Sequence, residues 1–162
     1  MRHTWRTGLS FGVTSGIITT LGLMAGLHSG THSKAAVMGG VLAIAVADAF
    51  SDAMGIHMAE EAAREHTHKE IWESTCSTFL SKFLFSMTFV VPLIFFPLGP
   101  AILVNIAWGL SLLVAFNYIL AKRQGIKPWR MIGEHLTIAV AVIIITHLLG
   151  DWIAEKFGNL NG

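Results

Sequence analysis

The sequence predicts an all-α membrane protein in which five helices cross the bilayer. Of its 162 residues, 53% are hydrophobic and only 13% are charged, whereas an ordinary soluble domain carries roughly 25% charged residues. No Asp, Glu, Lys, Arg or His occurs between Phe83 and Ala121. The apolar stretches are hydrophobic on all sides rather than along one stripe, which argues against a soluble helical bundle.

Five windows of about 20 residues have the length and composition of membrane-spanning helices. The uncharged stretch would measure about 58 Å as a single helix, nearly twice the ~30 Å bilayer core, so the chain must turn back within it. The motif FPLGP at residues 96–100 supplies that turn, because proline lacks an amide donor and glycine permits a tight turn. The predicted spans of this single domain, residues 1–162, are 8–28, 35–59, 77–98, 101–121 and 131–153. The first is too long and too glycine-rich for a typical signal peptide, so we expect it to be retained.

The distribution of basic residues predicts a cytoplasmic N-terminus. Nine Lys and Arg residues fall on the side that holds the N-terminus and two on the other side, and loops rich in Lys and Arg stay in the cytoplasm. Because five is an odd number, the C-terminus is expected on the opposite side. The nine are Arg2, Arg6, Arg64, Lys69, Lys82, Lys122, Arg123, Lys127 and Arg130, and the two are Lys34 and Lys156.

One face of the first span is made of glycine. At 100° per residue, six glycines fall within an arc of about 120°, which lets another helix approach closely in lipid. The partner is either a helix of the same chain or the first span of a second copy. We favour the second copy, because five spans cannot supply the two matching halves of an inverted-repeat transporter. The predicted dimer interface is Gly8, Gly12, Gly16, Gly22 and Gly26, with Gly30 on the same arc.

Two aspartates lie one helical turn apart in the apolar second span. Asp48 is near the middle of the span and Asp52 follows four residues later, so their side chains point the same way. Each ionised aspartate at the centre of a span costs about 2.5–3.5 kcal/mol on insertion scales. Two such carboxylates also repel one another unless a cation lies between them. The pair therefore predicts a cation or proton site in a transport pathway, and the alternative is a hydrogen-bonded pair that only holds helices together.

A second group of candidate metal ligands follows where the second span should leave the membrane. Carboxylate, imidazole and thioether groups together suit first-row transition metals better than Mg²⁺ or Ca²⁺. The alternative is a solvated juxtamembrane helix of mixed charge. If the helix continues without a break, the ligands share one stripe about 100° wide: Met54, His57, Met58, Glu61, Glu65 and His68.

The segments GLSFGVTSGIITTLGLMAGL and PWRMIGEHLTIAVAVIIITHLLG resemble the vacuolar iron transporter family, as does the order of five spans. The resemblance implies a homodimer that exports Fe²⁺ or Mn²⁺ from the cytosol in exchange for protons, along a path between first and second spans. It also implies that Glu61 and Glu65 gather metal on the cytoplasmic side. The family usually has an aspartate after GLS, where this chain has Phe11, and some members carry a helical metal-binding domain where this chain has only the short loop 60–76.

These observations together predict an antiporter for divalent transition metals in the cell (inner) membrane, not an enzyme. We expect metal and protons as transported ions, no permanently bound cofactor, and lipid and a second copy as partners. The net charge of +1 gives no indication of nucleic-acid binding. The alternative function is a membrane metal-sensing or assembly subunit that transports nothing.

Overall fold

The computed structural model describes residues 3–158, and these residues form helices and no strands. The all-α prediction is therefore confirmed for the described residues, whereas Arg2 lies outside them. Five helical segments are long and apolar enough to cross a membrane, with α3 and α4 counted together as one. The helices are α1 (His3–Thr31), α2 (Lys34–Ala63), α3 (His68–Thr88), α4 (Val90–Phe95), α5 (Leu98–Gln124) and α6 (Pro128–Phe157).

The connection between α2 and α3 is much shorter than the predicted loop 60–76. Helix α2 ends where Arg64 adopts a left-handed conformation with φ of 55°, and α3 begins again at His68. Thr67 and Glu70 form a reciprocal capping box, in which the Thr67 side chain accepts from the Glu70 amide and the Glu70 carboxylate accepts from the Thr67 amide. This cap explains the error, because it fixes the start of α3 nine residues before the predicted start of the third span at residue 77.

Prolines and glycine set the other boundaries. Pro92 cannot donate to the carbonyl four residues earlier, and its ring crowds that carbonyl, so the helix breaks between α3 and α4. Asn105 of α5 is fully buried and donates to the Phe89 carbonyl at this break, over 3.0 Å. The predicted turn at FPLGP is confirmed, because α4 ends at Phe95 and α5 begins at Leu98. Gly125, with φ of 70°, ends α5.

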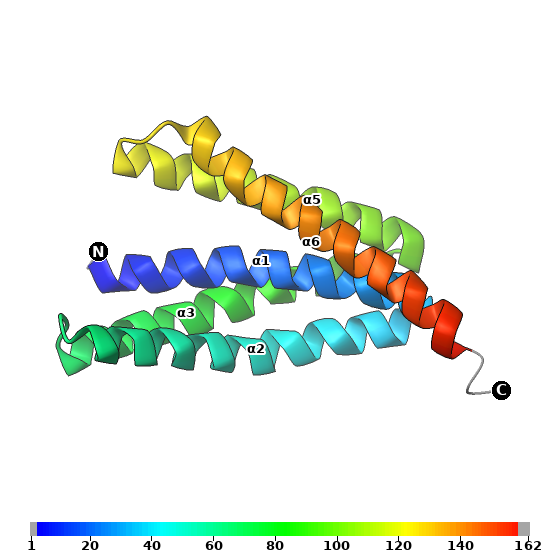
Figure 1. Ribbon diagram of the computed structural model, residues 1–162, viewed down its shortest axis with the longest axis horizontal. Helices are drawn as coiled ribbons and strands as arrows, with labels where there is room; N and C mark the ends of the chain where they lie inside the picture. The colour runs from blue at the N-terminus through cyan, green and yellow to red at the C-terminus, as the bar shows by residue number, and fades with distance from the viewer. Residues whose placement is uncertain (1–2, 159–162) are drawn as a thin grey trace.

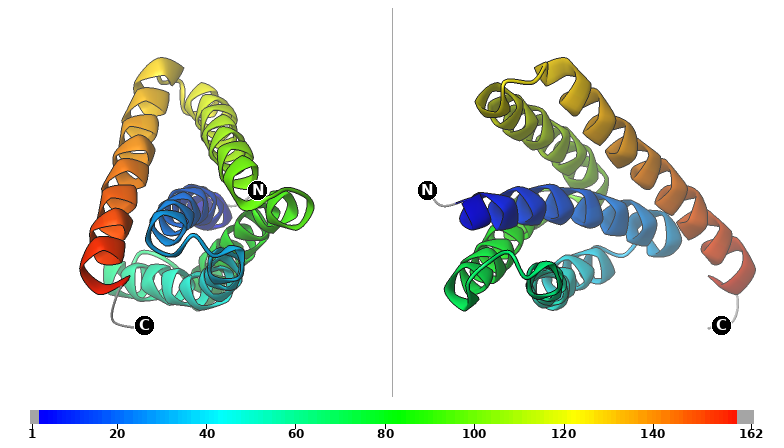
Figure 2. Two further views of the ribbon diagram at one scale, coloured as in Figure 1. Left: turned by 90° about the vertical axis from the view of Figure 1, so that its right-hand side faces the viewer. Right: turned by 60° about the vertical axis from the view of Figure 1, so that its left-hand side comes forward.

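Helix α1 is the centre of the bundle. Figure 1 shows it running between the pair α2 and α3 on one side and the pair α5 and α6 on the other, and Figure 2 shows the other helices surrounding it. Val13, Ile17 and Leu21 of α1 are almost fully buried and belong to one core cluster with Phe89 and Leu113. The start of α1 and the end of α6 lie at opposite ends of the bundle (Figure 1), as an odd number of spans requires.

The glycine face of α1 is covered by helices of the same chain. A Cβ on Gly8 or Gly12 would lie 2.1 Å from a hydroxyl oxygen of α3, and a Cβ on Gly26 would lie 3.2 Å from the Thr146 carbonyl of α6. In this structure α3 and α6 of the same chain therefore occupy the predicted dimer interface at Gly8, Gly12, Gly16, Gly22 and Gly26. The glycines pack against α3 and α6, and periodicity alone does not distinguish this packing from a contact between two copies.

Candidate functional site

Helix α2 carries both aspartates to the middle of the bundle, on the side that faces α3. Asp48 is the fifteenth residue of the 30-residue helix, so it lies about 21 Å from either end at ~1.5 Å per residue. The side chains of Asp48 and Asp52 are only 28% and 19% exposed. The structure thus keeps both carboxylates at mid-span and on one face, as the spacing predicts.

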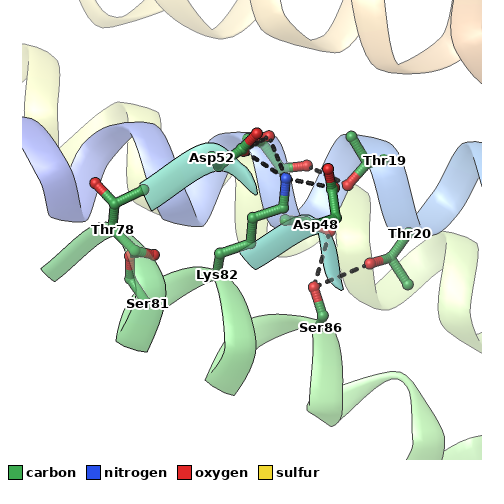
Figure 3. A network of polar contacts seen from close by, with 10 residues as sticks. Thr19, Thr20, Asp48, Asp52, Thr78, Ser81, Lys82 and Ser86 are labelled. Carbon is green, nitrogen blue, oxygen red and sulfur yellow. Dashed lines mark hydrogen bonds and ion pairs between the residues drawn. The ribbon is translucent and has the colours of Figure 1, made fainter. Parts of the chain in front are cut away.

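The cation between the two carboxylates is supplied by the protein itself. The ammonium of Lys82, on α3, forms ion pairs with the Oδ2 atoms of both Asp48 and Asp52. Figure 3 shows the Lys82 side chain reaching from α3 towards α2, with its Nζ between the two carboxylates. Lys82 is fully buried, so its assignment to the cytoplasmic side is wrong. Without Lys82, eight basic residues against two still favour a cytoplasmic N-terminus.

A hydroxyl group from α1 completes the cluster. Ser15 donates to Asp52 Oδ2 over 2.6 Å, and Lys82 Nζ donates to Ser15 Oγ over 2.9 Å. We call Ser15, Asp48, Asp52 and Lys82 the mid-membrane cluster. With all three ionisable groups charged, the cluster carries a net charge of −1. Removal of one partner of a buried ion pair strands an uncompensated charge, so loss of Lys82 would leave Asp48 and Asp52 without a counter-ion.

Close packing of α1 on α3 brings the cluster together. Gly12 and Gly16 of α1 have no side chain, so the backbone of α3 lies directly against them near Ser81 and Lys82. The hydroxyls on this face of α3 mostly return their hydrogen bonds to their own helix, as in Ser81 to the Ser77 carbonyl at 2.6 Å. Such hydroxyls are satisfied without water, which suits a helix contact in lipid. One layer further along, Thr20 donates to Ser86 over 3.1 Å.

An open groove lies beside the cluster on the outer surface of α1 and α2. It has a volume of about 450 Å³, and its lining includes Asp48 and Ser51 together with small residues of α2 such as Gly40 and Ala47. In a membrane this groove would place part of the Asp48 carboxylate against lipid, which is costly for an ionised group. The groove thus leaves part of Asp48 uncovered by the rest of the chain.

The predicted cytoplasmic stripe of metal ligands is not assembled within one chain. His57 is buried against α3, where Nδ1 lies 2.9 Å from Thr75 Oγ1, while Met54 and Met58 are exposed. Glu65 lies in the short connection and His68 on the next helix, because the break at residue 64 ends the stripe. Within residues 3–158, no three His, Cys, Asp or Glu side chains are placed to hold a metal ion. Within α2, His57 Nε2 and Glu61 Oε1 lie 3.8 Å apart.

The structure contains two polar contacts that the sequence analysis does not predict. Lys82 is a lone charge in an apolar stretch, at a depth that could match the aspartates of α2 once α3 is extended to its cap. His66 pairs with Glu60 over 2.6 Å across the connection, a contact that depends on the turn at Arg64. Residues 67–70, Thr-His-Lys-Glu, carry the sequence signature of the capping box.

A second polar cluster joins α1 to α6 near the other end of the bundle. Ser29 donates to the His147 carbonyl over 2.8 Å and to Asp151 Oδ1, and His147 Nε2 lies 3.5 Å from Asp151 Oδ2. The side chains of His147 and Asp151 are about half exposed, at 51% and 55%. We call Ser29, His147 and Asp151 the terminal cluster. Its charges are open to the surroundings rather than enclosed between helices.

Comparison with known proteins relates the first part of the chain to a known family. The model of the VIT family matches residues 9–74. The match covers Ser15, Asp48 and Asp52 but ends before Lys82. No curated protein matches the chain.

Proposed function

The match over residues 9–74 supports membership of the vacuolar iron transporter family, and on this premise we propose that the chain transports divalent transition metals. Membership suggests metal-ion transport in general. The finer proposal is export of Fe²⁺ or Mn²⁺ from the cytosol, with protons moving the other way.

The observation that carries the proposal is the pair of carboxylates held at mid-span around a cation. An acidic pair at this depth is costly to insert into a membrane. In a transport pathway such a pair can bind one cation after another. We propose that the Lys82 ammonium is the resting counter-ion of Asp48 and Asp52. An incoming divalent ion would take its place between the carboxylates while the flexible lysine side chain moves aside.

One chain provides few ligands for a metal at this depth. The mid-membrane cluster offers two carboxylates and the Ser15 hydroxyl, so water or a second copy must complete the coordination of a transition metal. We propose a homodimer in which the second copy covers the groove beside Asp48. This contact would shield the carboxylate from lipid, and it would replace the α1 glycine face as the dimer interface.

The acidic and histidine side chains at the predicted cytoplasmic end have a separate proposed role. Glu61 and Glu65 are exposed and are not assembled into a metal site. We propose that they raise the local concentration of cations near the pathway by electrostatic attraction. They would affect uptake at low metal concentration and leave the saturated rate nearly unchanged.

A second candidate function is favoured by Lys82 itself. Because the ammonium pairs with both aspartates, the cluster could be a permanent link between α2 and α3 in a protein that transports nothing. A metal-sensing or assembly subunit would need no more than this link.

Flux into liposomes tests the proposal directly. Purified protein reconstituted into sealed vesicles should move Fe²⁺ or Mn²⁺ and should move them faster when a proton gradient is imposed. Protein-free vesicles provide the leak rate, and Mg²⁺ and Ca²⁺ are the comparison ions, which should move at that leak rate. Absence of flux for every metal, in either direction and with either sign of pH gradient, would support the non-transporting subunit instead.

A further inference from the structure

A basic pocket lies between α1 and α5 at the end of the bundle that holds the N-terminus. It has a volume of about 340 Å³, which is large enough for the polar part of a ligand. Arg6 and Arg123 line it from the two helices, and the Thr7 and Ser10 hydroxyls lie on the α1 side. Neither arginine belongs to the mid-membrane cluster or to any contact invoked for transport.

The charges that line this pocket are not neutralised by the protein. No acidic residue is among its lining residues, and within residues 3–158 neither Arg6 nor Arg123 forms an ion pair. A neighbouring pocket of about 200 Å³ provides a contrast, because its lining includes Glu134, which pairs with Arg130 over 3.1 Å. The first pocket is therefore suited to an anion in a way that the second is not.

An apolar cavity adjoins the basic pocket on its membrane side. This cavity, of about 50 Å³, shares Arg6, Ser10, Leu120 and Arg123 with the first pocket and adds Leu9, Phe116 and Ile119. Phe116 lies two helical turns from Arg123, about 10 Å deeper along α5. The site thus has a cationic end at the predicted membrane surface and an apolar end towards the hydrocarbon.

We propose that this pocket binds an anionic phospholipid of the cytoplasmic leaflet. Arginine recognises a phosphate through paired hydrogen bonds, and basic pockets between membrane helices bind acidic headgroups. The phosphate is held by Arg6 and Arg123 and an acyl chain lies along Leu120 and Phe116. The lipid fastens the exposed end of α5 to α1. This inference depends on the chain being in a membrane and not on which ion it transports.

The test compares the lipid affinities of two matched double variants, which are measured by native mass spectrometry. Dioctanoyl phosphatidylglycerol is titrated against the purified full-length protein, with dioctanoyl phosphatidylcholine and glycerol 3-phosphate as separate probes. Arg6→Gln with Arg123→Gln should weaken phosphatidylglycerol binding about tenfold or more, since each basic side chain near the surface contributes to the attraction. Lys127→Gln with Arg130→Gln removes the same amount of charge at the neighbouring pocket and should change the affinity for phosphatidylglycerol less than twofold.

A third variant guards against loss of folding in the arginine variant. Leu120→Trp should reduce lipid binding by filling the pocket, while both arginines remain. Equal losses in the two double variants, or no loss with Leu120→Trp, would show general surface attraction and overturn the proposal. Glycerol 3-phosphate that competes as well as the lipid would overturn it too, because the site would then bind free phosphate esters.

Discussion

The mid-membrane cluster and the terminal cluster use similar groups in different surroundings. In each, a serine of α1 donates to an aspartate of a neighbouring helix, and a basic side chain lies beside that aspartate. Lys82 has a side-chain exposure of 1%, whereas His147 has 51%. Ser15 and Ser29 are 14 residues apart on α1, which corresponds to about 21 Å along the helix.

The difference indicates that burial depth, rather than residue type, decides how much stability is lost when one partner of a polar cluster is removed. Water or lipid headgroups can replace a lost partner in the terminal cluster, and ion pairs at such exposed positions contribute roughly 0–1 kcal/mol. In the mid-membrane cluster Lys82 is fully buried between helices, so a lost partner leaves a buried charge without compensation. The predictions below compare matched changes in or beside the two clusters.

The largest effect is expected from Lys82→Met. Removal of the Lys82 ammonium leaves Asp48 and Asp52 facing one another without a cation. We therefore expect a loss of about 3–5 kcal/mol in the free energy of unfolding. Lys156→Met, at an exposed lysine beyond the terminal cluster, should change it by less than about 0.5 kcal/mol. Unfolding in detergent, followed by helical circular dichroism, measures both.

Added metal separates the two candidate functions in the same variant. If Asp48 and Asp52 form a transport site, Mn²⁺ should restore much of the stability that Lys82→Met loses, because the metal takes the position of the ammonium. A variant that is destabilised and does not respond to Mn²⁺ would favour the permanent link. A loss below about 1 kcal/mol would contradict the assignment of Lys82 as the counter-ion.

The next effect concerns transport. Asp48→Asn keeps the size of the side chain but removes its charge, and we expect the rate of metal flux at low concentration to fall at least about 30-fold, equivalent to ~2 kcal/mol. Asp151→Asn makes the same chemical change in the terminal cluster and should lower flux less than twofold. Both are measured in liposomes at equal protein content. Similar losses for the two variants would remove the distinction between the clusters.

The smallest expected effect is a difference in stability between alanine substitutions at two glycines of α1, one beside each cluster. Gly12→Ala places a Cβ 2.1 Å from Ser81 Oγ and 2.5 Å from the Thr78 carbonyl, and overpacking of this kind costs about 1–3 kcal/mol. In Gly26→Ala the nearest atom is the Thr146 carbonyl at 3.2 Å. The higher helix propensity of alanine, worth ~1 kcal/mol, should offset most of the strain there. Thermal unfolding of the two variants should therefore differ, with Gly12→Ala melting lower.

Local composition was enough to predict the spans, because the free energy of placing a residue in the bilayer depends mainly on the polarity of that residue. Long apolar windows, the FPLGP turn and the depth of Asp48 all follow from residues near one another in the chain. Thr67 and Glu70 also carry a capping-box signature, and this cap starts α3 at residue 68 rather than at 77, the predicted start of the third span. The earlier start places Lys82 deeper in its helix than the predicted span does.

The sequence by itself determined that two carboxylates lie at mid-span on one face of a helix, since helical geometry and the cost of charge in lipid require only local information. Which side chain neutralises them was decided by the tertiary structure. The position of Lys82 opposite Asp48 and Asp52 depends on the register between α2 and α3. Their short connection and the close contact of α3 with Gly12 and Gly16 of α1 set that register. The same packing covers the glycine face that periodicity left open to a second copy, because small residues permit close approach without specifying which helix approaches.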